Sequence, residues 1–247
     1  MEGIPKTINY CWFGKGKKSK LFEKCINSWK KYMQDYEIKE WDEDNFDVNQ
    51  NDYCREAYLN KKWAFVSDYA RLKIIYDNGG IYLDTDVEII KSLLPIIEKG
   101  GYLGIESSGK VATGLGFAAR KNDKTIGKML KDYDKIHFEK DGKFDLTPCP
   151  IRNTASIEKI KKINKSEITQ VEDLFIYPAE YFCGYNQDIN SIDVTPNTYT
   201  IHHYEGTWLK RSDRSKTKLK KAVLKIIGEK NYNILQRKKR KWKKNEE

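Results

Sequence analysis

The stretch from Trp63 to Ile90, WAFVSDYARLKIIYDNGGIYLDTDVEII, restricts the folds open to this 247-residue chain more than any other. From Ala64 to Asp77 the apolar residues recur at helical spacing, which predicts a helix that buries one face. Residues 78–80, Asn-Gly-Gly, should end that helix, because glycine tolerates the positive φ that a helix C-terminus usually needs. The apolar residues 81–83 then predict a short buried strand.

Two aspartates stand directly after this strand. The sequence Asp84-Thr85-Asp86 follows the carboxyl end of the strand, where open α/β sheets place their ligands. Residues two apart on a strand point to opposite faces, so both acids can serve one site only if the strand bends or ends between them. Carboxylates suit Mg²⁺ or Mn²⁺, and such an ion commonly takes one or two carboxylates plus substrate phosphate oxygens. The pattern therefore indicates departure of a diphosphate; an acidic turn is the alternative, because Asp-x-Asp alone is weak.

The composite segment SDYARLKIIYDNGGIYLDTDV closely resembles the signature of the glycosyltransferase family 32 enzymes, which include capsule and lipooligosaccharide sugar transferases and yeast-type initiating mannosyltransferases. It is also similar to the catalytic core of the large clostridial glucosylating toxins. Helical spacing lets Ser67, Asp68 and Arg71 share one side of the helix. The resemblance implies that Arg71 bridges Asp68 and a nucleotide-sugar donor, and that Asp68 accepts hydroxyls of the sugar.

The same resemblance implies a full set of site residues. Tyr82 would pack near the ribose or the sugar, and Asp84 and Asp86 would hold the metal ion. The implied catalytic residues are Asp68, Arg71, Asp84 and Asp86, and the donor-binding residues from this segment are Ser67, Asp68, Arg71, Tyr82, Asp84 and Thr85.

The N-terminal residues 7–13, TINYCWF, predict a first buried strand followed by the flexible GKGKK. By resemblance, Trp12, Phe13 and Gly14 bind the donor, with the Trp12 ring stacked on the base. Such stacking is worth roughly 1 to 3 kcal/mol per base. A core tryptophan is the alternative. Gly114 is expected over the donor sugar, although small residues there can equally serve close packing.

The order of predicted elements gives the fold class. A strand at 7–13, a helix at 19–32 and a strand at 36–41 precede the central segment, which indicates βα units around a mostly parallel sheet. We expect an α/β protein with a single Rossmann-like domain over residues 1–209, of the GT-A glycosyltransferase type. In the later segment LTPCPIRNTASIEKI, Cys149 departs from the family pattern.

A second constellation is YTIHHYEGTW at residues 199–208, which resembles the closing motif of family 32. There a histidine after a strand reaches the metal, and Thr207 and Trp208 would hold the diphosphate. An imidazole ligand would shift the preference from Mg²⁺ toward Mn²⁺. Spacing does not decide between the two histidines. The order His-Tyr-x-Gly is similar to that at the metal histidine of related retaining galactosyltransferases, and this similarity favours His203 as the ligand, with His202 on the other side of the strand.

The basic charge of the chain lies in its C-terminal part. Residues 210–247 contain sixteen Lys/Arg and four Asp/Glu, a net charge of +12, against +10 for the whole chain. Apolar residues recur there at helical spacing among the lysines, so we expect a basic amphipathic helical tail that binds an anionic membrane surface. Nucleic-acid binding is the rival interpretation of this charge and is not expected.

Composition also bears on location. The five cysteines form no C-x-x-C and suggest reduced thiols in a cytosol. Neither a signal peptide nor about twenty consecutive apolar residues is found. The expected place is the cytoplasm, peripheral to the inner face of the plasma membrane.

These observations predict a retaining, metal-dependent glycosyltransferase that uses Mn²⁺ or Mg²⁺. It would move a hexose, galactose by preference, from a UDP-sugar to a lipid-linked oligosaccharide in bacterial capsular or surface polysaccharide synthesis. Because no carboxylate nucleophile stands out, a front-face reaction is the natural mechanism. The alternatives are a toxin-like protein glycosyltransferase, a GDP-mannose-dependent mannosyltransferase, and a noncatalytic nucleotide- or glycan-binding protein.

Overall fold

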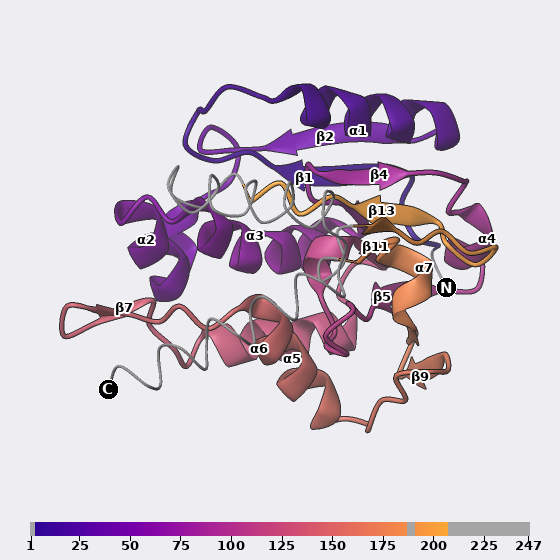
Figure 1. The fold of residues 1–247 in the computed structure, drawn as a ribbon. Coiled ribbons are helices and arrows are strands. Elements are labelled where there is room, and N and C mark those ends of the chain that lie inside the picture. Colours follow the sequence, from indigo (N-terminus) through magenta and orange to yellow (C-terminus); the bar gives the residue numbers. More distant parts are fainter. Residues whose placement is uncertain (1–2, 187–190, 207–247) are drawn as a thin grey trace, which may run out of the picture.

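The computed structural model describes residues 3–186 and 191–206 (Figure 1). The predictions for Thr207, Trp208 and the tail at 210–247 lie outside these described residues. Within the described ranges, every helix is too short or too polar to span a bilayer.

The centre of the fold is a seven-stranded sheet in the order β2-β1-β3-β6-β5-β10-β9. Strands β2 and β3 pair with β1 in parallel, and β10 pairs with β5 in parallel, whereas β6 and β9 run opposite to the others. The α/β class and the mostly parallel sheet are thus confirmed. The bounds of its strands are Thr7–Cys11 (β1), Glu37–Trp41 (β2), Gly80–Tyr82 (β3), Gly101–Gly104 (β5), Phe117–Ala119 (β6), Thr169–Val171 (β9) and Leu174–Tyr177 (β10).

Helices cover both faces of this sheet. Successive strand residues belong to different buried clusters: Ile81 packs on the side of α1, and Tyr82 on the side of α3. One face carries α1 (Lys20–Tyr32), α4 (Leu94–Ile97) and α7 (Ala179–Phe182). The other carries α2 (Asp52–Leu59), α3 (Trp63–Asn78), α5 (Lys124–Tyr133) and α6 (Cys149–Glu158).

Short elements complete the described chain. There are two 3₁₀ helices, η1 (Val48–Gln50) and η2 (Thr113–Leu115). Three two-stranded sheets pair β4 (Val87–Ile89) with β13 (Thr200–His202), β7 (Glu139–Lys140) with β8 (Lys143–Phe144), and β11 (Tyr185–Asn186) with β12 (Ser191–Ile192). Helix α2 is not among the elements predicted from the sequence.

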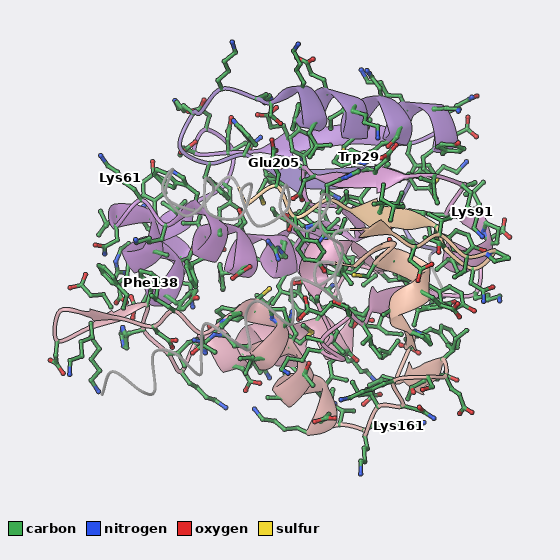
Figure 2. All side chains as sticks on the ribbon, in the orientation of Figure 1. Trp29, Lys61, Lys91, Phe138, Lys161 and Glu205 are labelled. Atoms are coloured by element: carbon green, nitrogen blue, oxygen red, sulfur yellow. The ribbon has the colours of Figure 1, made fainter. Side chains whose placement is uncertain are left out.

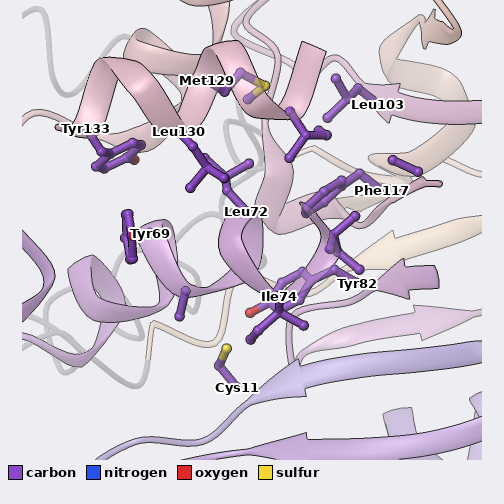
Figure 3. Close-up of a cluster of buried hydrophobic side chains, with 14 of the residues drawn as sticks. Cys11, Tyr69, Leu72, Ile74, Tyr82, Leu103, Phe117, Met129, Leu130 and Tyr133 are labelled. Atoms are coloured by element: carbon purple, nitrogen blue, oxygen red, sulfur yellow. The ribbon is translucent and has the colours of Figure 1, made fainter. Parts of the chain in front are cut away.

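Helix α3 occupies the middle of the fold and buries more than one face. Leu72 and Ile74 lie in the core between α3, α5 and the sheet, as Figure 3 shows. The helix ends where the sequence predicts: Gly79 has φ +71°, and its N–H donates to the Ile75 carbonyl over 2.8 Å. A side chain at Gly79 would also meet the Pro5 ring at 2.8 Å, so both conformation and space require glycine there. The chain then enters β3 directly, which fixes the position of the aspartates that follow.

Helix α1 supports β4 from the other side. Trp29 is fully buried, and its indole N–H donates to the Val87 carbonyl over 2.7 Å. Figure 2 labels Trp29 on the side of α1 that faces β4. This hydrogen bond satisfies a carbonyl just after the Asp-x-Asp turn.

We expect Trp29→Ala to lower the free energy of unfolding by about 3–5 kcal/mol, because it leaves a large cavity and an unpaired carbonyl. Urea denaturation followed by circular dichroism measures this. The control is Lys30→Ala, at the exposed next position, which should stay within about 0.5 kcal/mol of wild type. Equal effects of the two substitutions would contradict the described packing of α1.

Candidate active site

The Asp-x-Asp turn joins the seven-stranded sheet, which it leaves after β3, to the two-stranded sheet of β4 and β13. β3 ends at Tyr82 and β4 begins at Val87, so Asp84 and Asp86 lie outside both strands. The strict alternation of a strand therefore does not apply to them, and both carboxylates can face one site. β13 pairs antiparallel with β4, with His202 opposite Val87, and this register brings the histidines of the closing motif to the aspartates.

Asp84, Asp86 and His202 form a cluster whose potential ligand atoms lie within 4.8 Å of one another. His202 Nε2 is 3.0 Å from Asp86 Oδ1, and the Glu205 N–H donates to Asp86 Oδ2 over 2.8 Å. Two carboxylate oxygens and one imidazole nitrogen suit Mn²⁺ better than Ca²⁺, which prefers an all-oxygen shell. The described residues thus fit a divalent transition ion.

The structure places His202, and not His203, beside the aspartates. His203 Nε2 lies 2.8 Å from Glu88 Oε2, and Lys24 binds that same oxygen over 2.6 Å. The sequence preference for His203 as the metal ligand is therefore corrected by the geometry. His203 follows the last residue of β13; its N–H donates to the Asp86 carbonyl over 3.0 Å while its ring turns to β4.

The charges of this cluster are strongly coupled. Burial alone would raise the pKa of Asp86, but the charge and hydrogen bond of His202 and the Glu205 N–H bring it down to about 2. Burial would lower the pKa of His202, but Asp86 outweighs burial and the pKa of His202 is raised. Burial raises the pKa of Asp84, and the charge of Arg71 opposes that rise.

Arg71 connects the helix to the Asp-x-Asp turn. Its guanidinium is 4% exposed, with Nη1 3.1 Å from Asp68 Oδ1 and Nη2 3.1 Å from Asp84 Oδ1. The Tyr82 hydroxyl donates to Asp84 Oδ1 over 2.9 Å, and the Arg71 guanidinium lies 5.2 Å from the Tyr82 ring centroid. The buried residues Asp68, Arg71 and Tyr82 therefore form one network with the half-buried Asp84, as the spacing on the helix suggested for the first two.

Two further residues reach Arg71 from elsewhere in the chain. Thr113 Oγ1 accepts from Arg71 Nη1 over 3.4 Å and from Asn153 Nδ2 over 3.1 Å. Cys149 Sγ lies 3.6 Å from Arg71 Nη1, and burial raises the pKa of this thiol. Asn153 is not among the site residues predicted from the sequence. The missed signal is a polar residue on the core-facing side of α6.

Gly114 borders the metal cluster. A Cβ added there would stand 2.7 Å from Asp84 Oδ2 and 3.5 Å from Arg71 Nη1. The space that a side chain would fill is therefore taken by the Asp84 carboxylate. Ser67 on α3 and Thr85 in the turn are both partly exposed beside this network and stay donor-binding predictions.

The predicted base-binding segment divides into different roles. Trp12 is partly exposed, and its indole N–H donates to the Gly16 carbonyl over 2.9 Å. Phe13 is 6% exposed and packs against Phe46 in the core, so its ring faces away from solvent. Gly14 has φ +85°, and an added Cβ would lie 2.4 Å from the Trp63 ring.

A hollow of about 450 Å³ opens beside Trp12, at the carboxyl ends of β1 and β2. Both basic and acidic side chains line it, among them Lys17, Lys18, Glu40 and Asp42. Of the three residues of the predicted base-binding segment, Trp12 borders this hollow.

Comparison with known protein families identifies the central segment. Residues 19–102 match the family model described as "Glycosyltransferase sugar-binding region containing DXD motif". This segment is similar to the sugar-binding region of glycosyltransferases of the DXD type. The matched residues run from the start of α1 into β5 and include Asp68, Arg71, Asp84 and Asp86. The resemblance to family 32 stated from the sequence is thereby confirmed.

No curated protein matches the sequence. Among solved structures, "PaToxG Glycosyltransferase" is similar at 20% identity over 64% of this chain and 69% of that chain, with a TM-score of 0.46. A glycosyltransferase involved in glycosylation of the major capsid of PBCV-1 is similar at 10% identity over 86% and 98%, with a TM-score of 0.47. The galactosyltransferase LgtC, in complex with donor and acceptor sugar analogs, is similar at 12% identity over 88% and 95%, with a TM-score of 0.44.

We expect Gly114→Ala to lower Mn²⁺ affinity and donor turnover about 10- to 100-fold, because the new methyl group must displace the Asp84 carboxylate. Calorimetric titration with MnCl₂ measures the affinity. Gly3→Ala, whose added Cβ meets nothing within 4 Å, is the matched control and should leave both quantities unchanged. Unaltered Mn²⁺ affinity in Gly114→Ala would show that Asp84 is free to move.

His202→Ala is expected to weaken Mn²⁺ binding by more than about tenfold, whereas His203→Ala should stay within about threefold of wild type. The reason is that His202 lies in the cluster and His203 is held by Glu88. The same titration decides between them. The reverse ranking would restore the sequence-based choice of His203.

The pH dependence of this titration has a defined sign. A metal-binding imidazole must be neutral, and the pKa of His202 is raised above its ordinary value of about 6.5. Mn²⁺ affinity should therefore fall as pH falls through this raised pKa, and the slope should be smaller in His202→Ala. In the metal-free protein the free energy of unfolding depends on pH in the opposite direction. The His202–Asp86 ion pair stabilises the fold fully below about pH 6.5, and this stabilisation is lost as pH rises through the raised pKa of His202.

Proposed function

We propose that this protein transfers a hexose from a UDP-sugar to a glycan acceptor with retention of anomeric configuration. The observation that carries the proposal is the joining of Asp84 to two groups of residues: Asp86 and His202 on one side, and Arg71 and Asp68 on the other. The first group suits a metal-bound diphosphate, and the second suits the hydroxyls of a sugar. A nucleotide sugar contains both chemical parts side by side.

The hollow beside Trp12 supports a nucleotide at the far end of the donor. The partly exposed Trp12 ring at the edge of this hollow is suited to stacking on a base, at roughly 1 to 3 kcal/mol. Asp42 offers an acceptor for ring N–H or ribose hydroxyl groups, and Lys17 offers a cation for phosphate, whereas Lys18 and Glu40 form an ion pair with each other. A UDP-hexose, with UDP-galactose as first choice, is the donor that we propose.

Each residue of the site then has a part in the reaction. When bound at Asp84, Asp86 and His202, a divalent ion, Mn²⁺ or Mg²⁺, supplies Lewis-acid stabilisation of the leaving diphosphate. Arg71 keeps Asp84 oriented and places positive charge beside the same group. Asp68, held by Arg71, accepts hydroxyl hydrogen bonds from the donor sugar and fixes its position.

Retention without a carboxylate nucleophile is consistent with the pairing of the acids. Asp68 and Asp84 are bound to Arg71, and Asp86 is bound to His202. Each carboxylate is therefore engaged in holding another group. We propose that the acceptor hydroxyl attacks on the face from which the diphosphate leaves, with a diphosphate oxygen taking its proton.

The remaining predictions concern acceptor and location. We propose a bacterial surface or capsular glycan as the acceptor, assembled at the cytoplasmic face of the membrane on a lipid-linked oligosaccharide. The basic residues at 210–247 support this proposal through their charge, since each Lys or Arg near an anionic leaflet contributes about 1 kcal/mol. Transfer to a protein is the second outcome that acceptor assays must allow for.

The test is donor hydrolysis and binding across a panel of UDP-, GDP- and CMP-sugars with Mn²⁺, Mg²⁺ or chelator. We expect one UDP-hexose to be turned over only with metal, and Asp86→Ala to lower the rate at least 100-fold. Asp141→Ala, at an exposed acid of the β7–β8 hairpin, is the control and should behave as wild type. NMR of the product reports the anomeric configuration.

Each other outcome has a definite meaning. Preferred turnover of GDP-mannose would assign a mannosyltransferase and contradict the uridine assignment. An inverted anomeric linkage would exclude the front-face reaction. Binding of a nucleotide sugar without turnover toward any acceptor or water would contradict catalysis by this chain.

A further inference from the structure

The thiol of Cys149 lies in the network that we assign to the donor sugar. Its Sγ is 3.6 Å from Arg71 Nη1, and the same nitrogen binds Asp68 Oδ1 over 3.1 Å. Of the five cysteines, Cys149 and Cys183 are partly exposed, and the other three are buried. Cys149 therefore combines contact with this network and access from solvent.

The backbone that carries this thiol is tightly held. Helix α6 begins at Cys149, between Pro148 and Pro150, and each proline restricts the backbone next to it. The Thr154 hydroxyl donates to the Pro150 carbonyl over 2.7 Å and accepts from the Val111 N–H over 2.8 Å. These contacts join the start of α6 to the segment before η2, so the thiol keeps its place beside Arg71.

The charges around the thiol keep it protonated. Burial raises the pKa of Cys149, the carboxylates of Asp68 and Asp84 raise it further, and the Arg71 guanidinium opposes this rise. A protonated thiol can donate one hydrogen bond and accept another. Burial raises the pKa of Asp68, and Arg71 and the hydrogen bond from the Cys149 thiol oppose that rise. Asp68, Arg71 and Cys149 thus close a ring of three contacts.

Two more polar groups lie near Asp68 without a partner. Tyr53 of α2 and Tyr133 of α5 are 0% and 2% exposed, and neither hydroxyl has a hydrogen-bond partner in the described part of the chain. Burial raises the pKa of both, and the charge of Asp68 is the next cause of the rise. Most buried hydroxyls are paired, so two unpaired ones beside a carboxylate indicate a place for a water or ligand hydroxyl.

We propose that Cys149 is a positioning residue of the donor-sugar site: its thiol donates to Asp68, accepts from Arg71, and so holds the Asp68 carboxylate toward the sugar. This inference rests on the proposed function and adds a residue to it. The thiol acts on the sugar half of the donor and not on the nucleotide, because its contacts are with Asp68 and Arg71.

Calorimetry with UDP and with UDP-galactose, in saturating MnCl₂, separates the two halves of the donor. In Cys149→Ala, UDP-galactose should bind about five- to tenfold more weakly, as expected for one lost hydrogen bond, while UDP affinity stays within about twofold. Cys149→Ser keeps a donor and an acceptor and should restore UDP-galactose affinity to within about threefold of wild type. The control is Cys183→Ala, at the other partly exposed cysteine, which should bind both ligands as wild type does.

Three results of this titration would overturn the proposal. Equal weakening of UDP and UDP-galactose in Cys149→Ala would show a purely structural role. Unchanged affinity for both would show no role, and a serine variant as weak as the alanine variant would exclude the hydrogen bond. If the donor panel selects another nucleotide sugar, the same comparison uses that donor and its nucleotide.

A readout without any nucleotide distinguishes failure of this inference from failure of the proposed function. The rate at which iodoacetamide alkylates Cys149 across pH, measured by mass spectrometry of its peptide, reports ionisation of the thiol. In Asp68→Asn, alkylation near pH 8 should be at least about tenfold faster, because the carboxylate no longer opposes the thiolate. Cys54, at 0% exposure, should stay unmodified in both proteins, which shows that the fold is kept.

The two readouts together assign any failure. An unchanged alkylation profile in Asp68→Asn would overturn the contact between Cys149 and Asp68, whatever the donor is. A shifted profile in a protein that binds no nucleotide sugar would support that contact and contradict the proposed function instead.

Discussion

The buried guanidinium of Arg71 is the group on which the rest of the site depends. Burying a charge is costly unless it is paired, and Arg71 is paired twice, with Asp68 on its own helix and Asp84 beyond β3. Ion pairs of this kind contribute little net stability, because desolvation offsets their attraction. What they fix is geometry: α3 must lie against the end of β3 for the buried Arg71 to be paired with both Asp68 and the half-buried Asp84.

The apolar contacts of α3 supply the stability that holds this geometry in place. Leu72 and Ile74 are fully buried, at 0% and 1% exposure, and Figure 3 shows them in the core around α3. The packing of the hydrophobic side therefore sets the position of the helix, and this position also places Asp68 and Arg71 on its polar side. On the polar side Thr113 and Asn153 complete the hydrogen bonds of Arg71 from segments distant in sequence. Packing and polar satisfaction thus select the same arrangement.

Local features of the sequence were sufficient for much of this. The helix before Gly79, the end of β3 and the turn with Asp84 follow from periodicity and glycine conformation, which depend on neighbouring residues. The choice between His202 and His203 does not, because it depends on the register of β13 against β4, which joins residues more than a hundred positions apart. Asn153 was missed for the same reason: its partner Thr113 is forty residues earlier. Pairing across the fold is not encoded in any short window.

Helix α3 also contacts the loop beside Trp12, where we propose that the nucleotide base binds. Trp63, its first residue, lies so close to Gly14 that no side chain fits between them, and Gly14 belongs to the loop that follows β1. Asp68 and Arg71 lie further along that same rigid rod. A displacement of the loop when a base stacks on Trp12 must therefore tilt the helix or break its contact with Gly14. Helix α3 therefore couples the position of the loop after β1 to the positions of Asp68 and Arg71.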